Sequence, residues 1–174
     1  MEDNLNEKFE STFKDLIKGK VKKVSKEKLK EEINRYISKH CICTLATCAD
    51  NIPRATVLRY GYKDFTLYIL SEGGGKIRNI KENPGVSVTI YGEYTGFQSV
   101  NSLQIWGNAK LIHPDEHEKF KEVMEVMKTE ERQDLKNMGA TEVKIKMYAI
   151  KIQIEKARYL NLPEGIINKS IEVK

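Results

Sequence analysis

The chain has 174 residues, of which 40% are hydrophobic and 32% charged, and its formal net charge is +5. This length predicts one domain, or one domain with an appendage, and the composition is typical of a globular protein with a buried core. No apolar run approaches the roughly 18 residues that a membrane span needs. The polar start MEDNLNEKFE is unlike a secretory signal, and three cysteines favour free thiols over a disulfide framework. We therefore expect a cytoplasmic protein that does not contact membranes.

Residues 1–39 are predicted to be helical, because two apolar stripes recur there at helical spacing. The first stripe comprises Phe9, Phe13, Leu16 and Ile17, and the second comprises Leu29, Ile33, Tyr36 and Ile37. Gly19 is expected to end the first helix and Ser25 to cap the second. The lysines between them are interpreted as a solvated linker instead of a nucleic-acid patch, because no aromatic stacking platform accompanies them. We predict a helical N-terminal arm, residues 1–39, packed on a main domain of residues 40–174.

From residue 42 onward the pattern changes to strands separated by turn signals. The six predicted strands are ICTLATC, PRATVLRYGY, FTLYIL, VSVTIYG, SLQIWGNAKLI and VKIKMYAIKIQIE. Gly107 inside the fifth predicts a bend or a close backbone approach. In the last, the apolar positions change from odd to even numbers, which predicts a bulge near Tyr148–Ala149. Hairpin-linked strands with few helices predict a mainly β fold of the α+β class, an antiparallel six-stranded barrel with flanking helices.

All three cysteines, Cys41, Cys43 and Cys48, lie in one stretch that begins at His40. Zinc needs about four ligands in tetrahedral geometry, whereas alternate strand residues lie about 6.6–6.8 Å apart along the chain. A reactive thiol would need a helix N-terminus or a cationic neighbour, and only His40 is near in sequence. We interpret the cysteines as strand residues without a metal, and His40 as part of a helix-to-strand junction.

The segment SEGGGK, residues 71–76, lies between a predicted strand and a predicted helix. Its three glycines allow successive backbone N–H groups to face one concavity, and Lys76 adds a cation at the positive end of the helix. It is not a Walker A loop, because no Ser or Thr follows Lys76. Taken alone, the segment is compatible with a phosphate-binding loop and equally with a flexible solvent loop.

Three segments, in order, resemble the pyridoxamine 5′-phosphate oxidase-like family of FMN-binding split barrels. They are CTLATCADNIPRATVLRY, FTLYILSEGGGKIRNIKENPGVSVTIY and LQIWGNAKLI, and the resemblance covers about residues 42–112. It implies a six-stranded split β-barrel, FMN as the cofactor, and a homodimer with two flavins at the interface.

The resemblance also assigns cofactor-binding residues one by one. They are Arg54, Thr56, Val57, Leu58, Ile69, Leu70, Ser71, Gly74, Gly75, Lys76, Ser102 and Gln104. Lys76 takes the place of the family's phosphate-binding lysine, and Ser102 and Gln104 are candidates to reach the flavin from the partner subunit. The family often has Ser-Arg where this chain has Gly74–Gly75. One phosphate ligand is therefore missing, and the candidates to replace it are Arg54, Arg59 and Arg78.

The C-terminal segment RYLNLPEGIINKSIEVK lacks the arginine-rich motif with which true pyridoxamine phosphate oxidases bind substrate phosphate. The resemblance therefore implies an FMN-dependent oxidoreductase of another kind, which moves electrons or hydride from a nicotinamide donor to an acceptor that the sequence does not identify. The cofactor supplies the electron chemistry, so no catalytic side chain is assigned. Two alternatives stay open: a flavin-binding sensor or carrier without turnover, and the same barrel binding a deazaflavin or heme.

Overall fold

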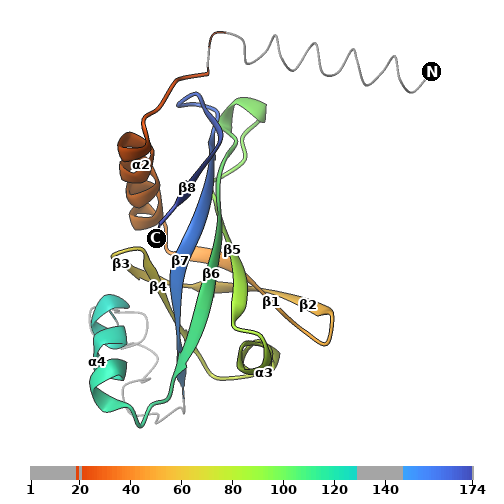
Figure 1. The fold of residues 1–174 in the computed structure, drawn as a ribbon, viewed down its shortest axis with the longest axis vertical. Coiled ribbons are helices and arrows are strands. Elements are labelled where there is room, and N and C mark those ends of the chain that lie inside the picture. Colours follow the sequence, from red (N-terminus) through yellow and green to blue (C-terminus); the bar gives the residue numbers. More distant parts are fainter. Residues whose placement is uncertain (1–18, 20, 129–146, 174) are drawn as a thin grey trace, which may run out of the picture.

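The computed structural model describes residues 19, 21–128 and 147–173 (Figure 1). Its elements are α2 (Lys26–Lys39), β1 (Ile42–Ala49), β2 (Ile52–Arg59), β3 (Gly61–Lys63), β4 (Thr66–Ser71), α3 (Gly75–Glu82), β5 (Gly85–Tyr91), the 3-10 turn η1 (Phe97–Ser99), β6 (Asn101–Ile112), α4 (His117–Val126), β7 (Tyr148–Asn161) and β8 (Ile166–Glu172). The predicted first helix lies outside the described residues, as do residues 143–146 of the predicted last strand.

The strands form one antiparallel sheet in the order β2-β1-β5-β6-β7-β4-β3, and β8 pairs with β7. The two ends of this order are β2 and β3, which are separated in sequence by Tyr60 alone. The sheet therefore curls until adjoining segments of the chain form both of its ends, as in a barrel. This confirms the predicted α+β class and antiparallel arrangement. The described residues contain eight strands instead of six, because the second predicted strand is interrupted at Tyr60 and β8 was not predicted.

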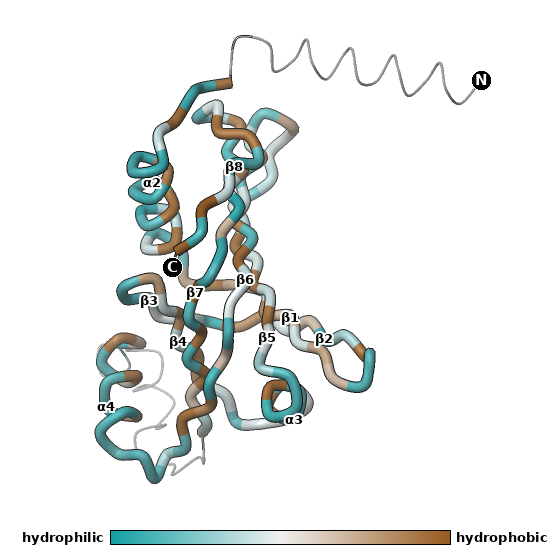
Figure 2. Tube along the Cα trace, viewed as in Figure 1, coloured by the Kyte–Doolittle hydropathy of each residue, from teal (hydrophilic) through white to brown (hydrophobic). Residues whose placement is uncertain are grey.

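The core lies on the inner face of the sheet, where alternate residues of neighbouring strands meet. Leu45 of β1 stands opposite Val88 of β5, which stands opposite Ile105 of β6, and all three side chains are buried. The stripe of α2 joins the same core through Leu29, Ile33, Tyr36 and Ile37. Figure 2 shows hydrophilic residues on the side of α2 that turns away from the sheet. This confirms the predicted second helix, whose cap is also as expected: the Lys28 N–H donates to the Ser25 hydroxyl over 3.2 Å.

The bulge predicted near Tyr148–Ala149 is wrong, since β7 pairs regularly with β4 from Tyr148 and with β6 from Ala149 as far as Ile154. At the start of β7 both faces are buried, Ala149 against α4 and Ile150 in the main core, so the described part of the strand contains apolar residues at odd and even positions without an extra residue there. The extra residue is Glu155: Ile154 pairs with Gly107 of β6, but the next pair joins Lys156 to Trp106.

Gly107 stands beside this bulge, where the backbones of β6 and β7 approach closely. A Cβ built on Gly107 would collide with the carbonyl oxygen of Gln153. The close approach predicted from the glycine is therefore confirmed, and its cause is the neighbouring bulge in β7.

Candidate functional site

The glycine-rich segment forms a turn that leads from β4 directly into α3. Gly73 and Gly74 have φ angles of 126° and 86°, a region that side chains rarely adopt. Gly74 precedes the helix without a side-chain cap, and its carbonyl accepts the Ile77 N–H over 3.1 Å. The N–H groups of Gly75 and Lys76, the first two residues of α3, precede the first intrahelical hydrogen bond, so they present partial positive charge at the start of the helix.

A cation from a neighbouring strand lies against this helix start. A Cβ built on Gly75 would come within 2.6 Å of Nε and 2.8 Å of Cζ of Arg54. The guanidinium of Arg54 therefore occupies space that any larger residue at position 75 would fill. The helix is held beside β2 through β1, because Asn79 Nδ2 donates to Thr47 Oγ1 over 3.2 Å and Thr47 pairs with Arg54. Both Asn79 and Thr47 are buried.

Internal hydrogen bonds fix the turn itself. The Gly73 N–H donates to the Ser71 hydroxyl over 3.2 Å, and Lys76 Nζ donates to the Gly73 carbonyl over 3.0 Å. The side chain of Ser71 is buried and therefore shapes the turn from beneath. The ammonium group of Lys76 is thereby held against the turn, and the Arg54 guanidinium lies against Gly75. We call this arrangement of Arg54, Ser71 and residues 73–76 the cradle.

The structure distinguishes between the three arginines that could replace the missing phosphate ligand. Arg59 donates to the Met127 carbonyl over 2.9 Å and is thereby directed toward α4. Arg78 is exposed on the second turn of α3. Arg54 has its guanidinium at the helix start, so it is the arginine that the fold places in the cradle.

The other predicted residues of β2 and β4 differ in whether a ligand could reach their side chains or only their backbones. Thr56 and Leu58 are half-buried and share the face of Arg54, whereas the Val57 side chain points to the opposite face and is 62% exposed. Ile69 is fully buried in the core, so only its backbone is open to a ligand. Leu70 is half-buried.

Ser102 and Gln104 lie on the outer face of the sheet, away from the cradle. Gln104 stands opposite Thr89 of β5, and Thr89 stands opposite Thr44 of β1. The neighbouring residues along these strands, Ile105 of β6 and Leu45 of β1, are buried in the core, so the three polar side chains lie on the outer face. Arg54 pairs with Thr47, which belongs to the core-facing set of β1. One protomer therefore presents its two sets of predicted flavin contacts on opposite faces of the sheet.

The cysteine stretch forms β1 and the residue before it. Cys43 is fully buried, and its burial raises the pKa of the thiol to about 12, whereas Cys41 is exposed and Cys48 half-buried. Within residues 19, 21–128 and 147–173, no three side chains of His, Cys, Asp or Glu gather as metal ligands. His40 follows α2 as its C-cap, and its Nδ1 lies 2.8 Å from the Tyr36 carbonyl oxygen. It is a junction residue, as interpreted, and it also lines a hollow of about 540 Å³ between α2 and the β7–β8 turn.

Sequence reasoning missed a second group of residues, one aromatic and four polar, which lie together where β6, β7 and β8 run side by side. The group comprises Trp106, Lys156, Arg158, Asn168 and Ser170. It was missed because β8 has no regular alternation of apolar residues, so its register with β7 gave no signal. The alternation of β7 on either side of Glu155 could have shown that Lys156 and Arg158 share a face.

The described residues thus define an antiparallel β-barrel with a cationic, glycine-rich helix start beside its second strand. The family model of pyridoxamine 5′-phosphate oxidase matches residues 29–161, and the chain belongs to this family. No curated protein matches it significantly by sequence.

Solved structures with the same fold bind different groups. A Listeria innocua protein described as a candidate pyridoxamine 5′-phosphate oxidase is 25% identical, with a TM-score of 0.58, over 76% of this chain and 98% of that one. An FAD-binding protein from Mesorhizobium loti is 22% identical (TM-score 0.56; 74% and 89% of the two chains). The heme storage protein HutZ from Vibrio cholerae is 19% identical (TM-score 0.59; 73% and 90%). In the described part of our chain, no helix is long and apolar enough to cross a membrane.

Proposed function

We propose that the protein binds FMN, with the flavin phosphate in the cradle. The observation that carries the proposal is the position of the Arg54 guanidinium against Gly75, the first residue of α3, at the positive end of that helix. The cations Arg54 and Lys76, together with the backbone N–H groups at the start of α3, suit a phosphate dianion. Relatives of this fold bind FAD or heme. Both flavin nucleotides, FMN and FAD, contain phosphate. Heme instead requires an axial ligand, which the cradle does not contain.

We further propose that the protein is an oxidoreductase that moves electrons or hydride from a nicotinamide donor to an acceptor. FMN supplies the redox chemistry when bound. The chain's own residues, Arg54, Lys76 and the backbone at the start of α3, would hold the phosphate of the bound cofactor. The alternative is a flavin carrier without turnover, and rates of flavin reduction separate the two.

A homodimer is proposed because the two sets of flavin contacts lie on opposite faces of one protomer. A second copy related by a two-fold axis could bring its Ser102 and Gln104 toward the flavin held by the first copy's cradle. The outer face also carries exposed apolar side chains, with Ile42, Val57 and Tyr91 exposed by 48%, 62% and 57%. Burial of such a patch by a second copy would contribute hydrophobic stabilisation.

The test of cofactor binding compares FMN with riboflavin, which lacks the phosphate. FMN should bind more tightly, and Lys76→Ala should weaken FMN binding about ten- to hundredfold, because a charge-assisted hydrogen bond contributes roughly 1.5–3 kcal/mol. Lys81→Ala, which removes a charge from the last turn of the same helix, is the matched control. Equal affinities for FMN and riboflavin would contradict the assignment. Anaerobic bleaching of the flavin by NADH or NADPH supports the oxidoreductase, and no bleaching by either supports the carrier.

The test of the dimer uses two exposed residues of β2 that point to opposite faces. Val57→Asp should give monomers by light scattering and weaken FMN binding, since it places a charge in the proposed interface. Ile52→Asp changes a residue that is 68% exposed but lies on the other face, and it should leave the dimer intact. A flavin-loaded wild-type monomer at micromolar concentration would contradict the proposal.

A further inference from the structure

Two bulges determine which side chains lie on the outer face of β7 and β8. A regular strand continuing from the buried Ile154 would turn Lys156 and Arg158 toward the core. The extra residue Glu155 restores the alternation, so that Ala157 is buried and both cations point outward. In β8, the register shift leaves one extra residue between the pairs of Ile166 and Lys169, where Asn168 has a φ of 50°. Bulges that redirect side chains are frequent beside functional sites.

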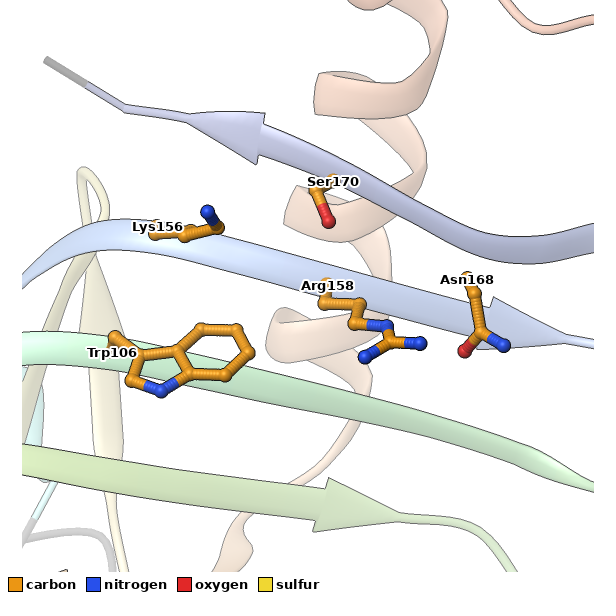
Figure 3. Close-up of a pocket in the computed structure, with 5 residues that line it drawn as sticks. All are labelled: Trp106, Lys156, Arg158, Asn168 and Ser170. Atoms are coloured by element: carbon orange, nitrogen blue, oxygen red, sulfur yellow. The ribbon is translucent and has the colours of Figure 1, made fainter.

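The redirected side chains line a pocket of about 430 Å³ together with Trp106 of β6 and Ser170 of β8 (Figure 3). Trp106 stands opposite Lys156, and Arg158 stands opposite Ser170. Figure 3 shows the Arg158 guanidinium lying between the indole ring and the amide of Asn168, with the Ser170 hydroxyl above it. The pocket thus combines one aromatic face with several hydrogen-bond donors on one side of the sheet. Its volume falls within the usual range for small-ligand sites.

The two cations of the pocket differ in their availability. Lys156 Nζ lies 3.2 Å from a carboxylate oxygen of Glu172, so its charge is already matched. In the described part of the chain, no hydrogen bond or ion pair engages the guanidinium of Arg158. The pocket therefore offers one free positive charge, with a planar fork that fits a carboxylate through two parallel hydrogen bonds. Because Lys156 and Glu172 offset each other, the single remaining positive charge matches a monoanion more closely than a dianion such as phosphate.

The geometry points to a binding site for a planar aromatic carboxylate. The ring would stack on the indole of Trp106, and the carboxylate would accept hydrogen bonds from Arg158, with Asn168 and Ser170 as further donors. One free cation matches one negative charge, so a monoanion is preferred to a phosphate ester.

The pocket also lies next to a residue assigned to the flavin. Arg158 stands directly opposite Gln104, and facing residues of paired strands have Cβ atoms about 4.5–5.5 Å apart. Gln104 is one of the two residues proposed to reach the flavin of the second copy. This step rests on the proposed function. In it, the carboxylate is the group by which the pocket recognises the redox substrate, which binds beside the flavin ring. The binding itself requires no flavin, so the two proposals can fail separately.

Trp106 is the chain's one tryptophan, so its fluorescence reports on this pocket. We would titrate the full-length chain, without added flavin, with benzoate, with benzamide as the neutral match and with phenyl phosphate as the dianion. Benzoate should change the emission in a saturable way, and calorimetry should give the same dissociation constant. Benzamide and phenyl phosphate should each bind at least about tenfold more weakly, because the first lacks the charge that Arg158 pairs with and the second carries one charge too many.

Arg158→Gln should weaken benzoate binding about ten- to hundredfold, and Arg158→Lys should weaken it less, because the charge remains but the planar fork is lost. Lys169→Gln is the matched control: the exposed Lys169 is a neighbour on β8, but it pairs with Tyr159 and belongs to the other face. Circular dichroism checks that each variant is folded. Benzamide binding as well as benzoate, an unchanged affinity in Arg158→Gln, or an equal loss in Lys169→Gln would overturn the inference. Tighter binding of phenyl phosphate would overturn the preference for a monoanion.

Discussion

Replacing Gly75 by Ala should weaken FMN binding without weakening the fold. The new Cβ would lie 2.6 Å from Nε of Arg54, whereas ordinary contacts between heavy atoms are about 3.5–4.0 Å. The guanidinium must therefore retreat by about 1 Å, which is enough to break a charge-assisted hydrogen bond whose optimal length is about 2.7–2.9 Å. Loss of that bond costs roughly 1.5–3 kcal/mol, which is about a ten- to hundredfold loss of affinity for FMN.

The fold should tolerate this substitution, because the atoms that move are the far end of a flexible side chain. Gly75 is the first residue of α3 and lies outside the left-handed region, so Ala should stabilise the helix by up to about 1 kcal/mol. Gly74→Ala is the contrasting variant. Its Cβ would meet no atom within 4 Å, but its φ of 86° makes a side chain cost about 1–2 kcal/mol.

The assay is quenching of flavin fluorescence with FMN and riboflavin in parallel, together with urea unfolding of each variant. Gly75→Ala should lose affinity for FMN, keep its affinity for riboflavin and unfold at the wild-type urea concentration or above. Combining it with Arg54→Ala should add little further loss, because both changes remove the same contact. An unchanged FMN curve in Gly75→Ala, or an equal loss for riboflavin, would refute the role given to Arg54.

Three further predictions concern stability and substrate. Gly107→Ala should lower the free energy of unfolding by about 1–3 kcal/mol or more in urea titrations, because its Cβ would meet the backbone oxygen of Gln153, which cannot swing away. Above pH 9.0 the unfolded chain releases the Cys43 proton, whereas the folded chain keeps it until about pH 12. Stability should therefore fall as pH rises through this window, and Cys43→Ala should reduce the fall by up to about 1.4 kcal/mol per pH unit; identical slopes would contradict the burial argument. With FMN bound, pyridoxamine 5′-phosphate should reduce the flavin little or not at all in anaerobic stopped-flow, since the pocket beside Gln104 offers one free cation; rapid bleaching would show that a phosphate site has been overlooked.

The inner half of the fold could be predicted from the sequence because its periodicity is regular. The stripe of α2 and the alternation of β5 and β6 each indicate one buried face, and the structure buries those faces. In β8 the inward residues Ile166 and Ile171 are five positions apart, because the extra residue at Asn168 shifts the phase. A strand interrupted in this way has no period of two, and only its pairing with β7 defines it.

The candidate site was predictable where it depends on local chemistry. Consecutive glycines before a lysine indicate the turn and the cation, and the cradle has both. The choice between Arg54, Arg59 and Arg78 was not predictable, because it depends on how α3 packs on β1 and β2. The pocket at Arg158 was hidden for a related reason: its residues come from three strands, and one bulge decides which way two of them point.

The extra residue at Glu155 also determines where the chain can change its length. Removing one residue from a strand normally exchanges inward and outward side chains on one side of the gap. Removing Glu155 would instead leave a regular strand, in which Ile154 and Ala157 still face the core, and only the bend would be lost. A gap in a sequence alignment of this family is therefore compatible with the barrel at position 155, whereas a gap elsewhere in β7 would turn polar residues inward. The bulge is thus a fixed reference point for aligning sequences whose identity is too low to align by themselves.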